Sequence, residues 1–206
     1  MTEGTEIEVT PEQSFSGSYG FVIIPDNTTQ VEAIKLARQL GPDAQFRPTV
    51  PHVTLYHARF KDLPREQVQE VLEQLTQIKS SQLSLGKIQI YGGKFLFWNI
   101  DKTDGIQKMH ETALSISQYL DKDSVARAVD EGLELTEIER QQMHYYGNPL
   151  VRDLYAPHIT LAYDSKGLAL PQANTKEWNM TIGEIAFAEI GDFGRVKRII
   201  HLDSDK

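Results

Sequence analysis

Hydrophobic positions along the chain follow two periods, one typical of strands and one typical of helices. Short apolar runs and two-residue alternation predict strands, and apolar residues at every third or fourth position predict amphipathic helices. Gly92-Gly93 lies between two strand-like runs and favours a two-residue hairpin turn. The predicted strands are 20–24, 52–60, 83–91, 94–100, 158–163, 180–190 and 195–202, and the predicted helices are 30–40, 64–78, 105–120 and 136–146.

Polar residues mark where two of these helices begin. Residues 27–29, Asn-Thr-Thr, are expected to cap the helix at 30–40, and Asp104 is expected to cap the helix at 105–120. Residues 1–17 are acidic and contain scattered Gly and Ser, so we expect a flexible tail before the folded domain.

Two of the predicted strands contain nearly the same pentapeptide. Pro-His-Val-Thr-Leu at 51–55 recurs as Pro-His-Ile-Thr-Leu at 157–161, and each copy follows a predicted helix and precedes a predicted hairpin. The shared order indicates an internal duplication whose period is too long for a solenoid repeat. We therefore predict an α+β fold with a single domain over 18–206, in which two similar lobes face each other across a cleft.

The repeated motif places an imidazole and a hydroxyl on the same face of each strand. Because side chains alternate along a strand, His52 and Thr54 point one way, and His158 and Thr160 do the same in the second copy. Two histidines can act as base and acid in one turnover, since one can be neutral while the other is protonated. Threonine hydroxyls can donate hydrogen bonds to phosphoryl oxygens. The four residues are candidates for in-line attack at phosphorus without a metal ion.

Alternation also suggests roles for residues beside the first motif. Tyr56 shares the predicted face of His52, where its ring would either stack on a nucleobase or form a wall of the cleft. His57 would point to the opposite face, so we interpret it as structural, and a zinc site built from His52 and His57 is not expected. His110 has no partner that the sequence identifies. No cofactor is expected.

The two His-x-Thr-Leu motifs and the order of the elements resemble the 2H phosphoesterase superfamily, which includes LigT-like RNA 2′,3′-cyclic phosphodiesterases. The resemblance covers about residues 18–203. It implies a duplicated fold of two antiparallel sheets facing a central cleft, with helices outside. His52 and His158 match the family's acid and base, the first protonating the leaving ribose oxygen and the second activating water. Thr54 and Thr160 match its phosphate-binding threonines.

The resemblance implies an enzyme that hydrolyses a 2′,3′-cyclic phosphate or a 2′-5′ linkage in a nucleotide or short oligonucleotide. A cyclic-dinucleotide phosphodiesterase, or a module that binds a nucleotide without turnover, is the alternative. The net charge of −8 argues against long nucleic acid as the substrate. The segment 121–148 has no counterpart that the resemblance explains.

Composition adds expectations about the setting of the protein. Hydrophobic residues make up 40% and charged residues 24% of the 206 positions, as in ordinary globular proteins. The sequence has no cysteine, no secretory signal pattern at its acidic start and no apolar run of roughly 18 residues. We therefore expect a cytoplasmic monomer that does not interact with membranes.

Overall fold

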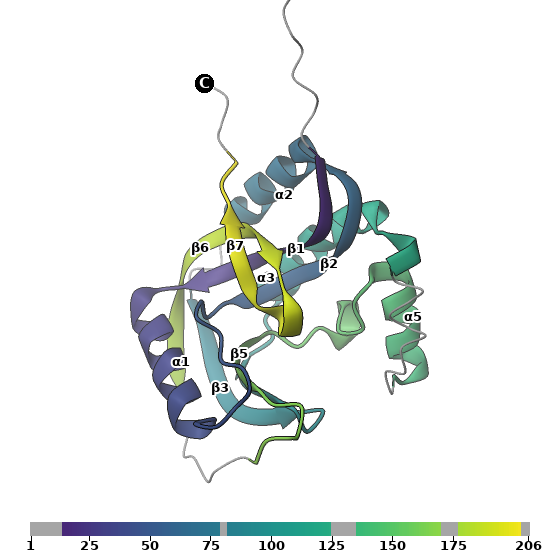
Figure 1. Ribbon diagram of the computed structural model, residues 1–206. Helices are drawn as coiled ribbons and strands as arrows, with labels where there is room; N and C mark the ends of the chain where they lie inside the picture. The colour runs from purple at the N-terminus through teal and green to yellow at the C-terminus, as the bar shows by residue number, and fades with distance from the viewer. Residues whose placement is uncertain (1–13, 79–81, 125–134, 170–176, 203–206) are drawn as a thin grey trace, which may run out of the picture.

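The computed structural model describes residues 14–78, 82–124, 135–169 and 177–202 (Figure 1). Each predicted helix and strand is present, although the helix expected at 105–120 is an α-helix followed by a 3-10 helix. With η denoting a 3-10 helix, the elements in chain order are β1 (Ser14–Pro25), α1 (Asn27–Leu40), β2 (Val53–Pro64), α2 (Arg65–Gln77), β3 (Gln82–Tyr91), β4 (Phe95–Ile100), α3 (Asp104–Ala113), η1 (Leu114–Tyr119), α5 (Glu137–Tyr146), η2 (Arg152–Leu154), β5 (His158–Tyr163), β6 (Trp178–Ile190), η3 (Asp192–Gly194) and β7 (Val196–Ile200).

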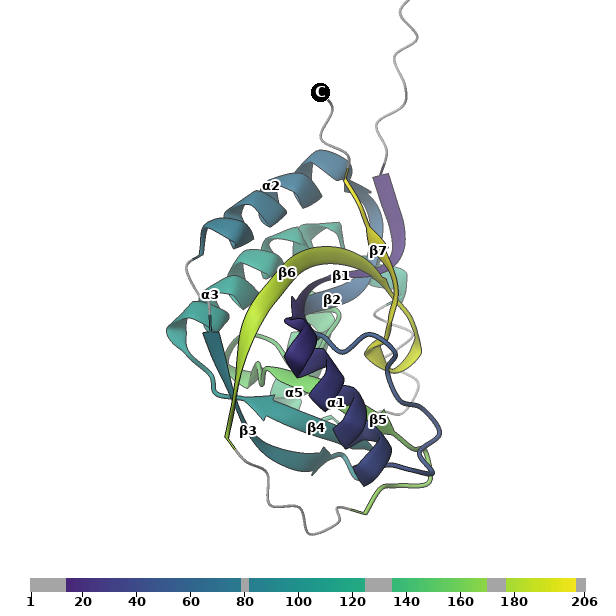
Figure 2. The same ribbon diagram turned by 90° about the vertical axis from the view of Figure 1, so that its left-hand side faces the viewer.

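The strands form one antiparallel sheet in the order β1-β2-β5-β4-β3-β6-β7, and a further pairing of β1 with β6 closes it. Figure 2 shows β6 as a long curved strand that arches from the β3 side of the molecule to β7. The predicted α+β class is confirmed. Two separate sheets are not present, because β2 pairs with β5 and β3 pairs with β6, and these pairings join the two parts.

The two sequence halves exchange their hairpins. The hairpin β3–β4 follows the first motif in the chain but pairs with β5, which carries the second motif. The hairpin β6–β7 follows the second motif but pairs with β1 of the first half. This exchange ties both halves into one folding unit around the motif strands.

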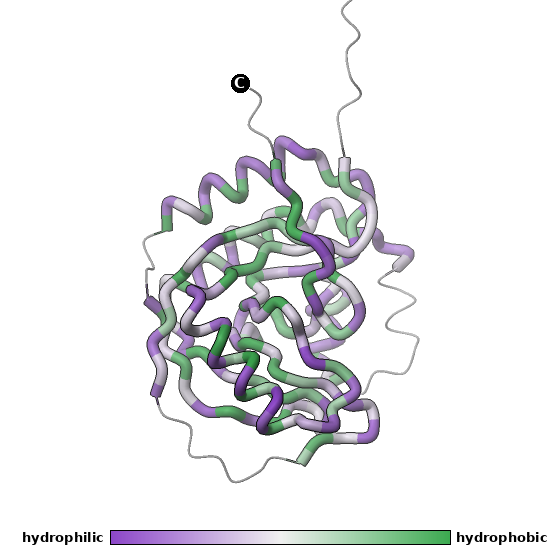
Figure 3. Tube along the Cα trace, turned by 60° about the vertical axis from the view of Figure 1, so that its left-hand side comes forward, coloured by the Kyte–Doolittle hydropathy of each residue, from purple (hydrophilic) through white to green (hydrophobic). Residues whose placement is uncertain are grey.

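Helices cover the sheet with one apolar side each. Helix α1 packs on β5 and β6, whereas α2 and α3 pack on each other and on β6 and β2 (Figure 2). In α2 the buried residues are Val68, Val71 and Leu75, spaced by three or four positions as an amphipathic helix requires. Hydrophilic and hydrophobic residues accordingly alternate along the helical turns in Figure 3. None of the described helices combines the length and apolarity needed to cross a membrane.

Both predicted helix caps lie one residue too late. Asp26, which precedes 27–29, caps α1, and its carboxylate accepts hydrogen bonds from the backbone N–H and the hydroxyl of Thr29. Thr103 caps α3, and Asp104 is the first helical residue instead. The cap must lie outside the helix to accept from its free N–H groups, and in both cases a polar residue stands at that earlier position.

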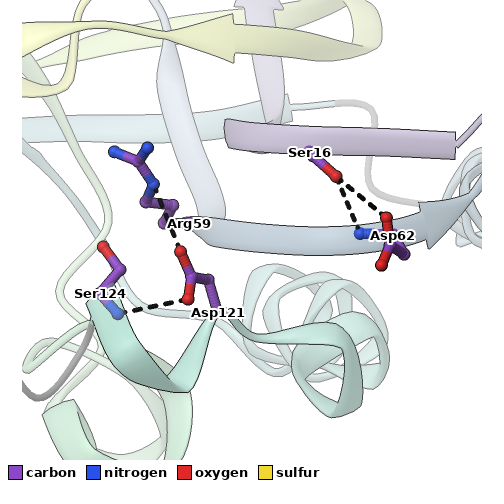
Figure 4. A network of polar contacts seen from close by, with 5 residues as sticks. All are labelled: Ser16, Arg59, Asp62, Asp121 and Ser124. Atoms are coloured by element: carbon purple, nitrogen blue, oxygen red, sulfur yellow. Dashed lines mark hydrogen bonds and ion pairs between the residues drawn. The ribbon is translucent and has the colours of Figure 1, made fainter.

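The strand β1 begins inside the predicted tail. Residues 14–17 belong to it, and the remainder of the tail lies outside the described residues. Ser16 fixes this end of β1 on β2, because its hydroxyl accepts from the backbone N–H of Asp62 at 3.0 Å (Figure 4). Arg59 forms an ion pair with Asp121 at 3.5 Å, which connects β2 to the segment after η1 (Figure 4).

Candidate active site

The two motif strands are neighbours in the sheet. Strands β2 and β5 run antiparallel, and their register pair joins the middle residues of the two motifs. Continuing this register places His52 opposite Thr160 and Thr54 opposite His158. The two copies are therefore related by a local twofold arrangement that brings the four predicted site residues together.

Both motif histidines make the same contact with the backbone. Nδ1 of His52 donates to the carbonyl oxygen of Val50 at 2.8 Å, and Nδ1 of His158 donates to that of Ala156 at 2.7 Å. In each copy the acceptor lies two residues before the histidine. A neutral ring whose proton is on Nδ1 has its lone pair on Nε2, so Nε2 is the reactive nitrogen in both.

A pocket with a volume of about 330 Å³ opens beside the second motif. Thr54, His158 and Thr160 line its wall, and the described residues around it include no Asp, Glu, Lys or Arg. Within the described part of the chain neither threonine hydroxyl has a hydrogen-bond partner, so both are available to a ligand. The end of the segment that the family resemblance left unmatched also reaches the pocket, through Met143 and residues 147–148.

His52 does not line this pocket. Its side chain is 5% exposed, and its Nε2 lies 3.0 Å from the carbonyl oxygen of Gly194, a residue that does line the pocket. Gly194 and Phe193 have positive φ angles of 73° and 59° in η3, and Phe193 stacks on Tyr163 with the ring centroids 4.0 Å apart. The β6–β7 connection therefore covers the first histidine, a contact that the sequence does not reveal.

Burial lowers the pKa of both motif histidines, but their other contacts differ. The pKa of His158 is lowered to about 4, mainly by burial and to a smaller extent by the nearby His52 and His57, against the opposing effect of the Ala156 carbonyl. Burial also lowers the pKa of His52, but two carbonyl oxygens, of Val50 and Gly194, oppose that shift. Only a protonated ring can donate to both carbonyls, so these two contacts work against the effect of burial, which remains the larger of the two.

A β-bulge in β2 changes the face of the residues after Thr54. Thr54 and Tyr56 pair with consecutive residues of β1, so Leu55 is the extra residue. Leu55 and Tyr56 are both buried with 1% exposure, and the Tyr56 hydroxyl donates to the carbonyl oxygen of Tyr146 at 2.7 Å. Tyr56 lies in the pocket wall, as the second of its two predicted roles requires, but its buried ring has no free face for a nucleobase.

The same bulge turns His57 into the pocket wall. Strict alternation placed this residue on the opposite face, and the structure corrects that prediction. Gly20 on β1 leaves room for the bulge, because a Cβ atom there would lie 2.5 Å from the Cβ of His57 and from the carbonyl oxygen of Tyr56. The site thus contains a third imidazole.

Two buried side chains satisfy the carbonyl groups of the bulge. Nδ1 of His110 donates to Leu55 O at 2.5 Å, and the hydroxyl of Tyr155 donates to Thr54 O at 3.0 Å. The rings of His110 and Tyr155 stack, with their centroids 3.9 Å apart, and Nε2 of His110 accepts from the backbone N–H of Arg152 at 2.8 Å. His110, which had no partner in the sequence, links the first motif to the segment that leads into the second.

An aromatic stack supports the second histidine. Phe97 on β4 stacks against His158 with ring centroids 3.6 Å apart, and Tyr91 stacks against Phe97 at 5.4 Å. Phe97 is buried, whereas Tyr91 is 37% exposed and also lines the pocket. The stack orients the imidazole and presents an aromatic ring at the mouth of the pocket.

The described structure is a closed antiparallel sheet in which two His-x-Thr strands pair beside one pocket. The model of the 2′-5′ RNA ligase superfamily matches residues 25–192, and the chain belongs to this family. The resemblance to the 2H phosphoesterases is thereby confirmed.

Solved structures show the same fold at low sequence identity. Escherichia coli LigT complexed with NADP+ is 14% identical, with 91% of this chain and 96% of that chain covered and a TM-score of 0.54. A protein described as a phosphoesterase is 15% identical, with 90% and 94% covered and a TM-score of 0.54. LigT complexed with 3′-AMP is 15% identical, with 92% and 96% covered and a TM-score of 0.52. No curated protein matches the sequence.

Proposed function

We propose that the protein is a metal-independent phosphodiesterase that acts on a 2′,3′-cyclic phosphate or a 2′-5′ linkage in a nucleotide or short oligonucleotide. The observation that carries the proposal is the matched setting of His52 and His158, each with Nδ1 bonded to the carbonyl two residues before it. Membership of the 2′-5′ RNA ligase superfamily supports phosphoester chemistry. The LigT structures with 3′-AMP and NADP+ support a nucleotide as the substrate.

His158 is the proposed base. Its Nδ1 proton is held by Ala156 O, and within the described residues its Nε2 has no hydrogen-bond partner. Because burial lowers its pKa to about 4, the ring is neutral near pH 7 and can accept a proton. In the proposed step Nε2 takes a proton from water while the water oxygen bonds to phosphorus.

His52 is the proposed acid. The two carbonyl oxygens that face its ring nitrogens favour the protonated form, and a bound phosphodiester anion would favour it further. As the bond from phosphorus to the leaving ribose oxygen breaks, that oxygen takes the proton from Nε2. Nε2 must first leave Gly194 O, so the β6–β7 connection has to shift when substrate binds.

Thr54 and Thr160 are proposed to hold the phosphoryl group. Their hydroxyls line the pocket from the two motif strands, without partners in the described chain. Each can donate to one non-bridging oxygen and stabilise the charge that develops there. Tyr91, at the mouth of the pocket, offers a ring on which a base can stack.

The pocket favours a small substrate over long RNA. Its volume of about 330 Å³ is near the lower end of ordinary ligand sites, and no charged side chain lines it among the described residues. A cyclic-dinucleotide phosphodiesterase, or a binding module without turnover, is the alternative.

The proposal is tested by incubating the protein with EDTA and a panel of 2′,3′-cyclic nucleotides, 2′-5′ oligoadenylate and cyclic dinucleotides. Chromatography identifies the products. We expect turnover of a 2′,3′-cyclic nucleotide or the 2′-5′ oligomer by the wild type but not by the His52→Ala/His158→Ala double variant. Turnover of cyclic dinucleotides alone supports the first alternative. Binding without turnover on the whole panel supports the second.

A further inference from the structure

We propose, on the basis of the function proposed above, that His57 is a third substrate-binding histidine. In this proposal its ring donates a hydrogen bond to an oxygen of the bound phosphodiester, beside the groups held by Thr54 and His158.

The position of His57 is set by the bulge. Thr54 and His57 are both half-buried and both line the pocket, whereas Leu55 and Tyr56 between them also reach the pocket wall but are buried with 1% exposure. A regular strand would direct Thr54 and His57 to opposite faces, because their positions differ by an odd number. The extra residue removes that difference and places a second functional side chain of β2 in the same pocket.

The molecule maintains this irregularity with several dedicated contacts. His110 and Tyr155 satisfy the carbonyl groups of Leu55 and Thr54, and Gly20 supplies the space on the neighbouring strand. Bulges re-aim side chains and are common beside active sites. The contacts here keep His57 in the pocket wall.

The ring of His57 has no partner in the described protein. His52, His110 and His158 each use at least one ring nitrogen in a hydrogen bond to the backbone. Nδ1 of His57 is buried without a partner, and no hydrogen bond is made by its Nε2 within the described residues. The protein therefore uses neither nitrogen of this ring among its described residues, and Nε2 is left for a hydrogen bond to a ligand in the pocket.

The environment makes His57 a neutral donor. Burial and, to a smaller extent, the nearby His52 lower its pKa to about 4, so the ring is uncharged near pH 7. A buried N–H without an acceptor costs more free energy than a buried nitrogen lone pair without a donor. The proton therefore belongs on Nε2 rather than on the buried Nδ1. A phosphoryl or ribose oxygen in the pocket is an acceptor that fits this donor. The described residues contain no cluster of three or more ligating side chains placed to hold a metal ion.

The test measures the affinity of 3′-AMP, a probe with both kinds of oxygen, by isothermal titration calorimetry. The proteins compared are the wild type, His57→Ala, His57→Gln and the control His144→Ala, which removes an exposed histidine outside the pocket. Loss of one hydrogen bond to a charged group should weaken binding about tenfold in His57→Ala. His57→Gln should restore part of the loss, because its side-chain amide N–H has a similar reach.

A melting measurement on the same proteins separates binding from a structural role. Since His57 has no hydrogen-bond partner in the described chain, His57→Ala should melt at or above the wild-type temperature. Two results would overturn the proposal for His57: unchanged affinity in His57→Ala, or weaker binding that accompanies a lower melting temperature. Neither result bears on the proposed function. If the wild type binds neither 3′-AMP nor inorganic phosphate, both proposals fail.

Discussion

Replacing His110 with alanine should destabilise the protein more than replacing any exposed histidine. The ring is 0% exposed and joins three groups: Leu55 O in the bulge, the backbone N–H of Arg152 and the ring of Tyr155. Leu55 has no partner in the β1–β2 register, so its carbonyl depends on His110. The substitution therefore acts on the bulge and on the approach to the second motif.

The expected loss of stability in His110→Ala follows from those contacts. An unpaired buried carbonyl costs about 1–3 kcal/mol, and the partly buried N–H of Arg152 costs about 1 kcal/mol at the lower end of that range. Loss of the stacked ring pair adds about 0.5–1.5 kcal/mol. The free energy of unfolding should fall by about 3–5 kcal/mol. For a chain of this length that corresponds to a melting temperature lower by roughly 6–20 °C.

Thermal unfolding followed by circular dichroism measures this effect, with His144→Ala as the control. His144 is exposed, so its replacement should change stability by no more than about 0.5 kcal/mol. His110→Asn keeps a donor near the position of Nδ1, and His110→Gln keeps an acceptor near that of Nε2, so both should fall between alanine and wild type. If His110→Ala melts at the same temperature as the control His144→Ala, His110 does not support the bulge and the reasoning is refuted.

Three further predictions concern acid, phosphate binding and the aromatic stack. Burial lowers the pKa of His110 from 6.5 to about 4, and as pH falls below 6.5 the unfolded chain takes up a proton that the folded protein does not. The contribution of His110 to stability should therefore be full above pH 6.5 and fall by up to about 1.4 kcal/mol per pH unit between 6.5 and 4, in addition to the contributions of the other buried histidines. Urea unfolding should show a shallower fall in His110→Gln than in the wild type, and equal slopes would contradict this. Thr54→Val and Thr160→Val should each raise the KM for the substrate and lower kcat by about tenfold, because each removes one hydrogen bond to a charged group. Unchanged steady-state kinetics would exclude the threonines from the phosphate site. Phe97→Leu should lower kcat more than it raises KM, because it removes the ring that orients His158, and a change in KM alone would assign Phe97 to substrate binding instead.

Much of the fold follows from local sequence patterns. Helix and strand periods identified each described α-helix and strand but not the short 3-10 helices η2 and η3, and Gly92-Gly93 marked the β3–β4 turn, where both glycines have positive φ angles of 56° and 71°. These features depend on neighbouring residues only, so the sequence displays them directly. The duplicated motif likewise identified the residues that meet where β2 pairs with β5.

Features that depend on distant contacts could not be predicted in this way. The bulge at Leu55 is supported by His110, 55 positions away, and the adjacent Thr54 by Tyr155, 101 positions away. Gly194, which covers His52, is 142 positions away. Alternation assumes an unbroken strand, so it assigned His57 to the wrong face. The pairings of β2 with β5 and of β3 with β6 are also non-local, and they make one sheet where the family resemblance implied two.

The central claim is that two histidines perform the chemistry without a metal ion. The most direct test measures kcat/KM with EDTA on the substrate that the panel identifies, for the wild type, His52→Ala, His158→Ala and the control His144→Ala. One acid–base group contributes at least about 10²-fold, so each motif variant should lose at least that factor while the control keeps its rate and circular dichroism shows an intact fold. A folded His52→Ala or His158→Ala variant with near wild-type activity would contradict the account.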